Sequence, residues 1–246
     1  MSALKITAYT KERISTEIRD QDIDRIVEIT EFYFPKGEKV RSIVQAHIGA
    51  ADVIVLARKN DAIQGVSIAS ATLMQTPFSA RPIHAVYQRM LFLAPGELRR
   101  RTGLRLGIRT FRQLMGWLWF SRHFVLFCRT MNPHVVKRIR LFNEYYPRFG
   151  EAAPAEIIAF AHSLAPLLEA TEIDSRLKLI NIFPEYRNID ATAIWNQYLQ
   201  THCREYDDLV LDGSFMREGE RLIFTGNAQL LIGFHKPFGM LKLAFK

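Results

Sequence analysis

The residues that most clearly suggest chemistry in this sequence are arginines, clustered in the segment Arg99-Arg100-Arg101-Thr102-Gly103-Leu104-Arg105. The segment follows the apolar run from Val86 to Leu93 and the turn residues Pro95-Gly96, and it precedes a periodic stretch. A turn at the start of a helix aims backbone N–H groups and the positive end of the helix dipole at one point. Guanidinium groups add bidentate hydrogen bonds to phosphate oxygens. The segment therefore predicts a phosphate site.

The charge pattern supports an anionic ligand. The 33 Lys and Arg against 25 Asp and Glu give a formal charge of +8, and six arginines with no acid lie between Arg99 and Arg112. Such a cluster focuses a field on an anion. A solvated helix face is an equally simple explanation of the charge alone. A nucleic-acid surface is the third alternative, although no aromatic residues alternate with the arginines in a known binding motif.

Other functional classes have little support. The two cysteines, Cys128 and Cys203, form no metal-binding spacing and no disulfide framework, so we predict no metal and a reducing compartment. The N-terminal segment lacks an apolar signal core. The most hydrophobic window, 114–127, contains Arg122 and His123 and is too short to span a bilayer. We expect a cytoplasmic protein with no membrane span.

Hydrophobic periodicity indicates the elements that must position the arginines. The expected order is β, α, α, β, β, β, α, β, α, which predicts an α/β fold with a mixed central sheet flanked by helices. The expected strands are 4–9, 52–57, 64–74, 84–93 and 124–130, and the expected helices are 20–34, 39–48, 104–119 and 132–145. In the third helix, Leu104, Ile108, Phe111 and Met115 repeat at helical spacing and predict its buried face.

Beyond Gly150 the pattern is less regular. We expect helices over 154–170 and 189–205, and strands over 177–183, 209–211, 221–225 and 229–234. No linker separates this part, so we predict a first domain of residues 1–150 and a C-terminal α/β extension of residues 151–246 packed on it. The extension has three candidate roles: it closes the acceptor side, forms a lid, or forms a dimer surface.

This order of elements and the arginine segment resemble the GCN5-related N-acetyltransferase (GNAT) family over about residues 4–150. The signature of that family is Gln or Arg, two residues, Gly, one residue, then Gly or Ala. Here Arg100 and Gly103 match, whereas Arg105 stands where a small residue is usual. The resemblance implies a GNAT-like fold and acetyl-CoA or a longer acyl-CoA as cosubstrate.

The resemblance also implies roles for individual residues. The backbone of the central strand would pair with the pantetheine arm, the arginine segment would hold the pyrophosphate, and an asparagine would lie near the cofactor. The predicted cofactor-binding residues are Met90, Leu91, Phe92, Leu93, Arg99, Arg100, Arg101, Thr102, Gly103, Leu104, Arg105 and Asn132. Tyr145 or Tyr146 would protonate the leaving thiolate. Aromatic packing at a helix end is the competing explanation for both tyrosines.

Acyl transfer to an amine requires a neutral amine, and a base within reach provides it. We predict His84, at the head of the central strand, as that base, against the simpler alternative of a histidine that caps a strand end. The predicted function is transfer of an acetyl or longer acyl group from coenzyme A to an amine of a small molecule. The alternative is a non-catalytic GNAT-like module that binds a nucleotide or an anionic partner. A homodimer is possible in either case.

Overall fold

The computed structural model describes residues 4–34, 38–96 and 99–237, and these residues form two compact units. Unit 1 consists of residues 1–72 and 86–119, and unit 2 consists of residues 73–85 and 120–246. The predicted α/β class with a mixed sheet flanked by helices is confirmed. The units divide the chain at places other than residue 150, and the predicted domain boundary stays a prediction.

Unit 1 contains the expected order of strands and helices up to the third expected helix, with one additional short helix. Its elements are β1 (Lys5–Thr10), α1 (Lys11–Glu17), α2 (Asp20–Thr30), α3 (Glu38–Gly49), β2 (Val53–Lys59), β3 (Ala62–Thr76), β4 (Ser79–Leu93) and α4 (Arg99–Met115). The strands follow the order β1-β2-β3-β4, and β2 pairs antiparallel with both of its neighbours. The outer ends of β3 and β4, residues 73–85, belong to unit 2.

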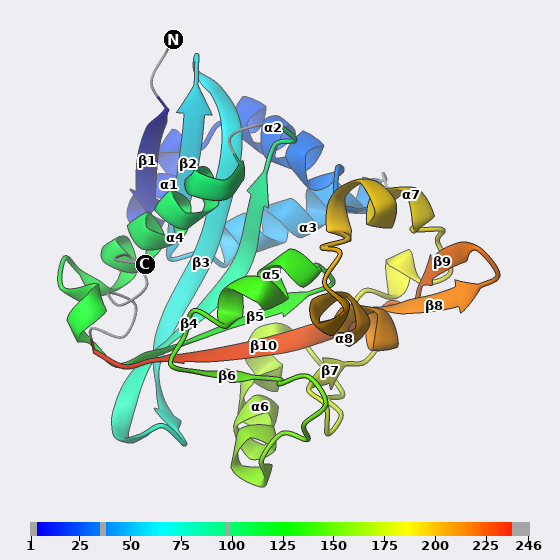
Figure 1. The fold of residues 1–246 in the computed structure, drawn as a ribbon. Helices are drawn as coiled ribbons and strands as arrows, with labels where there is room; N and C mark the ends of the chain where they lie inside the picture. Colours follow the sequence, from blue (N-terminus) through cyan, green and yellow to red (C-terminus); the bar gives the residue numbers. More distant parts are fainter. Residues whose placement is uncertain (1–3, 35–37, 97–98, 238–246) are drawn as a thin grey trace. The chain divides into compact units, whose positions relative to one another are not determined.

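Strand β2 is buried along most of its length because helices cover both of its faces. Ile54 and Leu56 point into a cluster with Ile26 of α2 and Val44 of α3. Side chains alternate along a strand, so Val55 faces the other side, where α4 lies across β1 and β2 (Figure 1). The strand therefore reads as a continuous apolar run rather than an alternating one.

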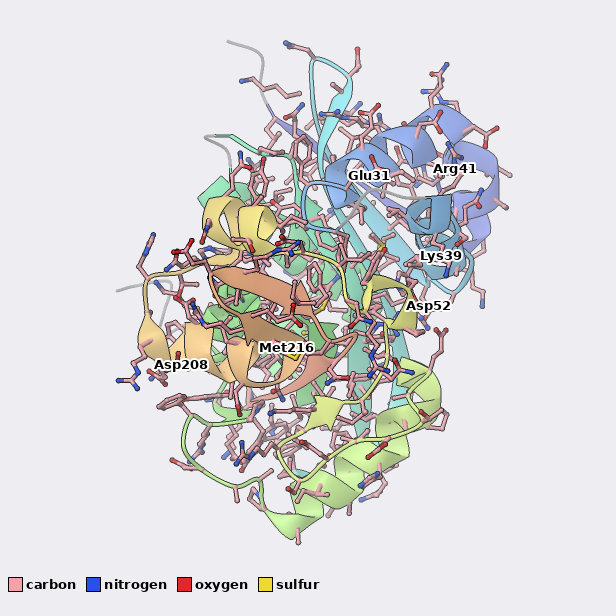
Figure 2. All side chains as sticks on the ribbon, turned by 90° about the vertical axis from the view of Figure 1, so that its right-hand side faces the viewer. Glu31, Lys39, Arg41, Asp52, Asp208 and Met216 are labelled. Atoms are coloured by element: carbon pink, nitrogen blue, oxygen red, sulfur yellow. The ribbon has the colours of Figure 1, made fainter. Side chains whose placement is uncertain are left out.

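Helices α2 and α3 present their charged sides to solvent. Arg41 of α3 forms an ion pair with Asp24 of α2 at exposed positions. Figure 2 labels Arg41 and Lys39 on α3 and Glu31 at the end of α2, all on this outer surface. One ion pair under this layer is buried: Arg58 Nη2 of β2 donates to Asp22 Oδ1 of α2 at 2.7 Å.

Unit 2 is built around β10, whose residues are all buried. Its elements are β5 (Phe124–Thr130), α5 (Pro133–Ile139), β6 (Glu144–Tyr146), α6 (Ala155–Leu168), β7 (Lys178–Leu179), α7 (Thr192–Ile194), α8 (Arg204–Ser214), β8 (Phe215–Glu218), β9 (Arg221–Phe224) and β10 (Ala228–His235). Strand β10 pairs antiparallel with β5 on one side and with β6 on the other. Strands β8 and β9 form a separate hairpin (Figure 1), and Figure 2 labels Met216 on it.

The order β5-β10-β6 shows how the C-terminal part is attached. Residues 147–227 are an insertion between two strands that are neighbours in the sheet. Gly233 allows α5 to pack closely on β10, because a Cβ at this position would lie 2.7 Å from Ile139 Cδ1 and 2.8 Å from Phe142 Cγ. The C-terminal segment thus supplies a central strand, which the sequence predicted as strand 229–234.

Several predicted elements are wrong in detail. Residues 209–211 lie in helix α8 rather than in a strand, because the segment 204–214 presents Val210 and Asp207 on one buried helical face. The predicted helix 189–205 is divided into α7 and a five-residue π turn, Trp195–Leu199. The predicted strand 177–183 is reduced to β7. No helix among the described residues is long and apolar enough to cross a membrane.

Candidate functional site

The arginine segment is helical rather than a loop. Helix α4 begins at Arg99, whereas the sequence predicted a start at Leu104. Arginine is a good helix former, and Pro95-Gly96 already supplies the turn before it. The first turn of α4 has no acidic residue. Its unpaired backbone N–H groups are therefore those of residues 99–102, where the positive end of the helix dipole is also located.

The end of β4 lies directly before this helix, and residues 94–98 connect the two. Met90 and Leu93 are buried, whereas Leu91 and Phe92 are half-buried. Helix α2 is followed by Tyr33, whose hydroxyl donates to the Leu93 carbonyl oxygen at 2.8 Å. The rings of Tyr33 and Phe92 stack with centroids 5.4 Å apart. The strand end is thus fixed by an aromatic cluster.

Three buried or half-buried polar side chains connect β3, β4 and α4, and no motif or periodicity in the sequence indicates them. The hydroxyls of Ser67 and Thr110 are 2.7 Å apart, and Thr110 also donates to the Leu106 carbonyl at 2.9 Å. Gln88 Nε2 donates to Ser67 Oγ at 3.1 Å and to the Met90 carbonyl at 2.6 Å. Because these groups hydrogen-bond one another, they hold α4 in place over β3 and β4.

The buried face of α4 was predicted only in part: Phe111 and Met115 are buried as expected. Leu104 is 57% exposed and Ile108 is 41% exposed, although both were expected in the core. The residues that face the sheet include Thr102, Leu106 and Thr110, all nearly inaccessible to solvent. Thr102 and Thr110 are small and allow the helix to approach the sheet closely, whereas Leu104 and Ile108 lie on the exposed side.

Arg105 is exposed on α4. It lines a groove of about 380 Å³ together with Ile6 of β1, Ile108, Arg109 and Arg112. The Nε atom of Arg109 is buried and has no hydrogen-bond partner among the described residues. Of the predicted phosphate ligands, Thr102 and Gly103 are buried. The side chains of Arg99, Arg100 and Arg101 lie outside the described part of the structure.

In unit 2, His84 lies on the outer half of β4. It is half-buried, and burial together with the positive charge of Arg122 lowers its pKa below the usual value for histidine. Both effects disfavour the imidazolium. A neutral imidazole near pH 7 is the form that a general base requires.

Asn132 lies at the start of α5 and caps that helix. Its Oδ1 atom accepts a hydrogen bond from the His134 backbone N–H at 2.9 Å, and its own N–H donates to Thr130 Oγ1 at 2.9 Å. Asparagine before Pro133 is a typical helix start. The cap occupies the side-chain oxygen, so the side-chain NH₂ is the group left for a ligand.

Tyr145 and Tyr146 lie on strand β6, not near the end of a helix. Helix α5 ends at Ile139, earlier than predicted, and Tyr145 and Tyr146 pair with Gly233 and Ile232 of β10. Successive residues of a strand point to opposite faces, so the two hydroxyls cannot share one role. The guanidinium of Arg148 lies 5.8 Å from the Tyr145 ring centroid and 5.5 Å from that of Tyr146.

The predicted site residues therefore fall into two groups. Unit 1 brings together the end of β4 and the first turns of α4, and unit 2 holds His84, Asn132, Tyr145 and Tyr146. Within residues 4–34, 38–96 and 99–237, no three His, Cys, Asp or Glu side chains are arranged to hold a metal ion.

No protein-family model matches the chain, and no curated protein matches it in sequence. Solved GNAT-family structures are similar to part of it. A GNAT-family acetyltransferase from Brucella melitensis in complex with acetyl-CoA is 19% identical, with coverage of 50% of this chain and 75% of that one and a TM-score of 0.34.

A putative GNAT-family acetyltransferase from Desulfovibrio desulfuricans is 16% identical, with coverage of 59% and 88% and a TM-score of 0.40. An aminoglycoside N-acetyltransferase, AAC(6')-Iy, in complex with CoA is 15% identical, with coverage of 46% and 70% and a TM-score of 0.35. At these identities and TM-scores, the similarity assigns no activity, substrate or site residue to this chain.

Proposed function

We propose that this chain is an acyl-CoA-dependent N-acyltransferase that transfers an acetyl or longer acyl group to an amine of a small molecule. The observation that carries the proposal is the sequence of β4, a short connection and α4, with arginines and no acid in the first helical turn. A pyrophosphate at this helix start would accept hydrogen bonds from the backbone N–H groups of residues 99–102.

The proposed reaction is direct transfer. The amine nitrogen attacks the thioester carbonyl carbon, the new C–N bond forms, and the C–S bond breaks to release the CoA thiolate. A backbone N–H near the end of β4 would stabilise the oxyanion. His84 would take the proton of the amine, which its lowered pKa favours near pH 7.

The thiolate needs a proton, and Tyr145 or Tyr146 would supply it. Their positions on opposite faces of β6 make this a choice between two single variants. Replacing the true donor with Phe is expected to lower kcat by about 10²-fold or more. The other Phe variant serves as its matched control, because it removes the same hydroxyl from the other face.

The acceptor side is proposed near the end of β4. The rings of Tyr33 and Phe34 pack on Phe92, with centroids 5.4 and 5.8 Å apart. This cluster is a rigid apolar wall beside the strand that would hold the thioester. It favours an acceptor or acyl chain with an apolar part, and the C-terminal extension stays a proposed lid, acceptor wall or dimer surface.

Calorimetric titration with acetyl-CoA and with a long-chain acyl-CoA tests the proposal. Tight binding of either donor is expected, weakened by Arg100→Ala or Arg101→Ala but not by Arg217→Ala, an exposed arginine on β8. Each lost phosphate contact should reduce affinity by roughly tenfold, as expected for a hydrogen bond to a charged group. Failure of both donors to bind at low salt would refute the cofactor site.

The second candidate, a non-catalytic module that binds a nucleotide or anionic partner, is favoured by Arg105 in the place of a small residue. Release of free thiol from acyl-CoA in the presence of amines distinguishes the two. Binding of CoA and of ADP without thiol release would support the module. Cytoplasmic location and a homodimer stay predictions.

A further inference from the structure

Exposed apolar side chains are concentrated on one element, α4 and the turn that follows it. Eight large hydrophobic residues are strongly exposed among the described residues, and four of them belong here. These four are Leu104 at 57%, Ile108 at 41%, Trp117 at 63% and Leu118 at 56% exposure. Scattered single residues need no explanation, but a cluster on one face marks an interaction surface.

Arginines occupy the same face. Arg105, Arg109 and Arg112 line the groove beside Ile6 and Ile108. The guanidinium carbon of Arg112 lies 3.6 Å from the centroid of the Trp117 ring. No acidic residue occurs anywhere in residues 98–143. The part of the face that α4 contributes is therefore both apolar and positive.

Three guanidinium groups indicate what the groove is suited to hold. Arg105, Arg109 and Arg112 all line it, and guanidinium groups bind phosphate oxygens through bidentate hydrogen bonds. A headgroup phosphate in the groove would lie among these three side chains. The apolar wall of Ile6 and Ile108 would then lie beside the group that carries the phosphate.

We infer that this face of α4, which we call the α4 face (Ile6, Leu104, Arg105, Ile108, Arg109, Arg112, Trp117 and Leu118), docks on an anionic lipid bilayer. Arginine, aliphatic residues and tryptophan on one face are the combination that binds the headgroup and acyl boundary. The headgroup phosphate would enter the groove, and Leu104, Ile108 and Trp117 would enter the acyl boundary. The inference goes beyond acyl transfer and does not depend on it.

Two other occupants fit less well. A nucleic acid would satisfy the arginines, but its sugar–phosphate surface offers nothing to exposed Leu104 and Ile108, which gain free energy only in an apolar environment. A second copy of the chain through the same face would place like charges opposite each other. An anionic bilayer satisfies both the charge and the apolar residues.

Vesicle co-sedimentation of the full chain tests the inference. We expect binding to phosphatidylcholine vesicles that contain phosphatidylglycerol, and much weaker binding to phosphatidylcholine alone. Arg109→Gln and Arg112→Gln should each weaken binding about fivefold, the effect of one basic residue at a membrane surface. Ile108→Ser should weaken it about tenfold by removing a buried aliphatic side chain. None of these residues belongs to the proposed cofactor site.

Matched controls are available in unit 2. Leu73 is 63% exposed and Arg217 is exposed on β8. Leu73→Ser removes an exposed aliphatic side chain, as Ile108→Ser does, and Arg217→Gln removes one positive charge, as Arg109→Gln and Arg112→Gln do. Both should bind vesicles as the wild type does. Circular dichroism of every variant tests whether it is folded. For a folded variant, a loss of vesicle binding is due to the changed surface side chain and not to unfolding.

Four results would overturn the inference: equal binding to neutral and anionic vesicles, no effect of Ile108→Ser, loss of vesicle binding when millimolar inorganic phosphate competes at constant ionic strength, or tighter binding to duplex DNA than to vesicles. The phosphate result would identify a free-phosphate site, and the DNA result a nucleic-acid surface. Acyl-CoA titration of the same variants separates the two proposals, because Arg109→Gln should leave acyl-CoA affinity unchanged.

Discussion

Gly65 is the position where the packing of α4 on the sheet can be tested most directly. A Cβ at Gly65 would lie 2.6 Å from Leu93 Cδ2 and 3.1 Å from Leu106 Cδ1. Both leucines are buried, at 8% and 0% exposure, so neither can move aside without repacking. Gly65→Ala is therefore expected to overpack the contact between β3, the end of β4 and α4.

Two opposing effects determine how much Gly65→Ala changes the free energy of unfolding. Overpacking of a buried site costs about 1–3 kcal/mol, whereas alanine in a strand gains roughly 0.5–1 kcal/mol over glycine by limiting the unfolded chain. The flexible ends of the leucines keep the cost near the middle of its range. We expect Gly65→Ala to lower the free energy of unfolding by about 1 kcal/mol, or Tm by roughly 2–4 °C in a chain of this size.

Gly107→Ala is the matched control. Gly107 lies in α4, and a Cβ there would have no atom within 4 Å apart from its chain neighbours and the backbone of its own helical turns. Alanine is the better helix former by about 1 kcal/mol, so this variant should be more stable than the wild type. Urea denaturation followed by circular dichroism measures both. A Gly65→Ala protein as stable as Gly107→Ala would refute the close approach of α4 to β3.

Three further predictions concern individual side chains. If His84 is the base, kcat/KM should fall as pH drops through the lowered pKa of His84, below about 6.5. His84→Gln should remove this inflection from the pH dependence of kcat/KM. An unchanged pH dependence in the variant would exclude His84 as the base. Arg58→Met leaves the Asp22 side chain, which is 7% exposed, without its cation. The free energy of unfolding, measured by urea denaturation, should fall by about 3–5 kcal/mol, and a decrease below about 1 kcal/mol would contradict a buried pair. Burial raises the pKa of the Cys128 thiol to about 12, so Ellman's reagent at pH 8 should modify only Cys203 in the native protein and both thiols in urea; two reactive thiols in the native protein would be inconsistent with the structure.

The sequence predicted the order of elements well where periodicity was strong. Strand β5 was expected at the bounds that it has, and β10 was expected within a residue or two. Both are apolar runs between clear turn residues, and their burial on both faces leaves little ambiguity. Their pairing was not predictable, because the 147–227 insertion separates β10 from its neighbour β6 and pairing over such a distance leaves no local pattern.

The C-terminal half was harder to predict because its elements are short. Residues 209–211 have β-prone types but lie in α8, where Val210 is buried against the rest of unit 2. There, tertiary packing outweighs the local β propensity of the residues. Tyr145 and Tyr146 were predicted in a helix but lie in β6 for the same reason. They pair with β10, and no local sequence pattern indicates this pairing.

Helix α4 shows why the candidate site was predicted only in part. An apolar stripe was assumed to mark the buried side, and Phe111 and Met115 of that stripe are buried. Leu104 and Ile108 are exposed, whereas Thr102 and Thr110 are buried, because the Thr110 hydroxyl hydrogen-bonds with the Leu106 carbonyl and the Ser67 hydroxyl. Polar atoms that are paired locally cost little to bury, and small side chains let α4 approach β3 at Gly65. The close approach forces Leu104 and Ile108 to the outside, beside arginines. The packing that places the start of α4 for a phosphate thus also creates an apolar, positive outer face, and one helix serves both proposals.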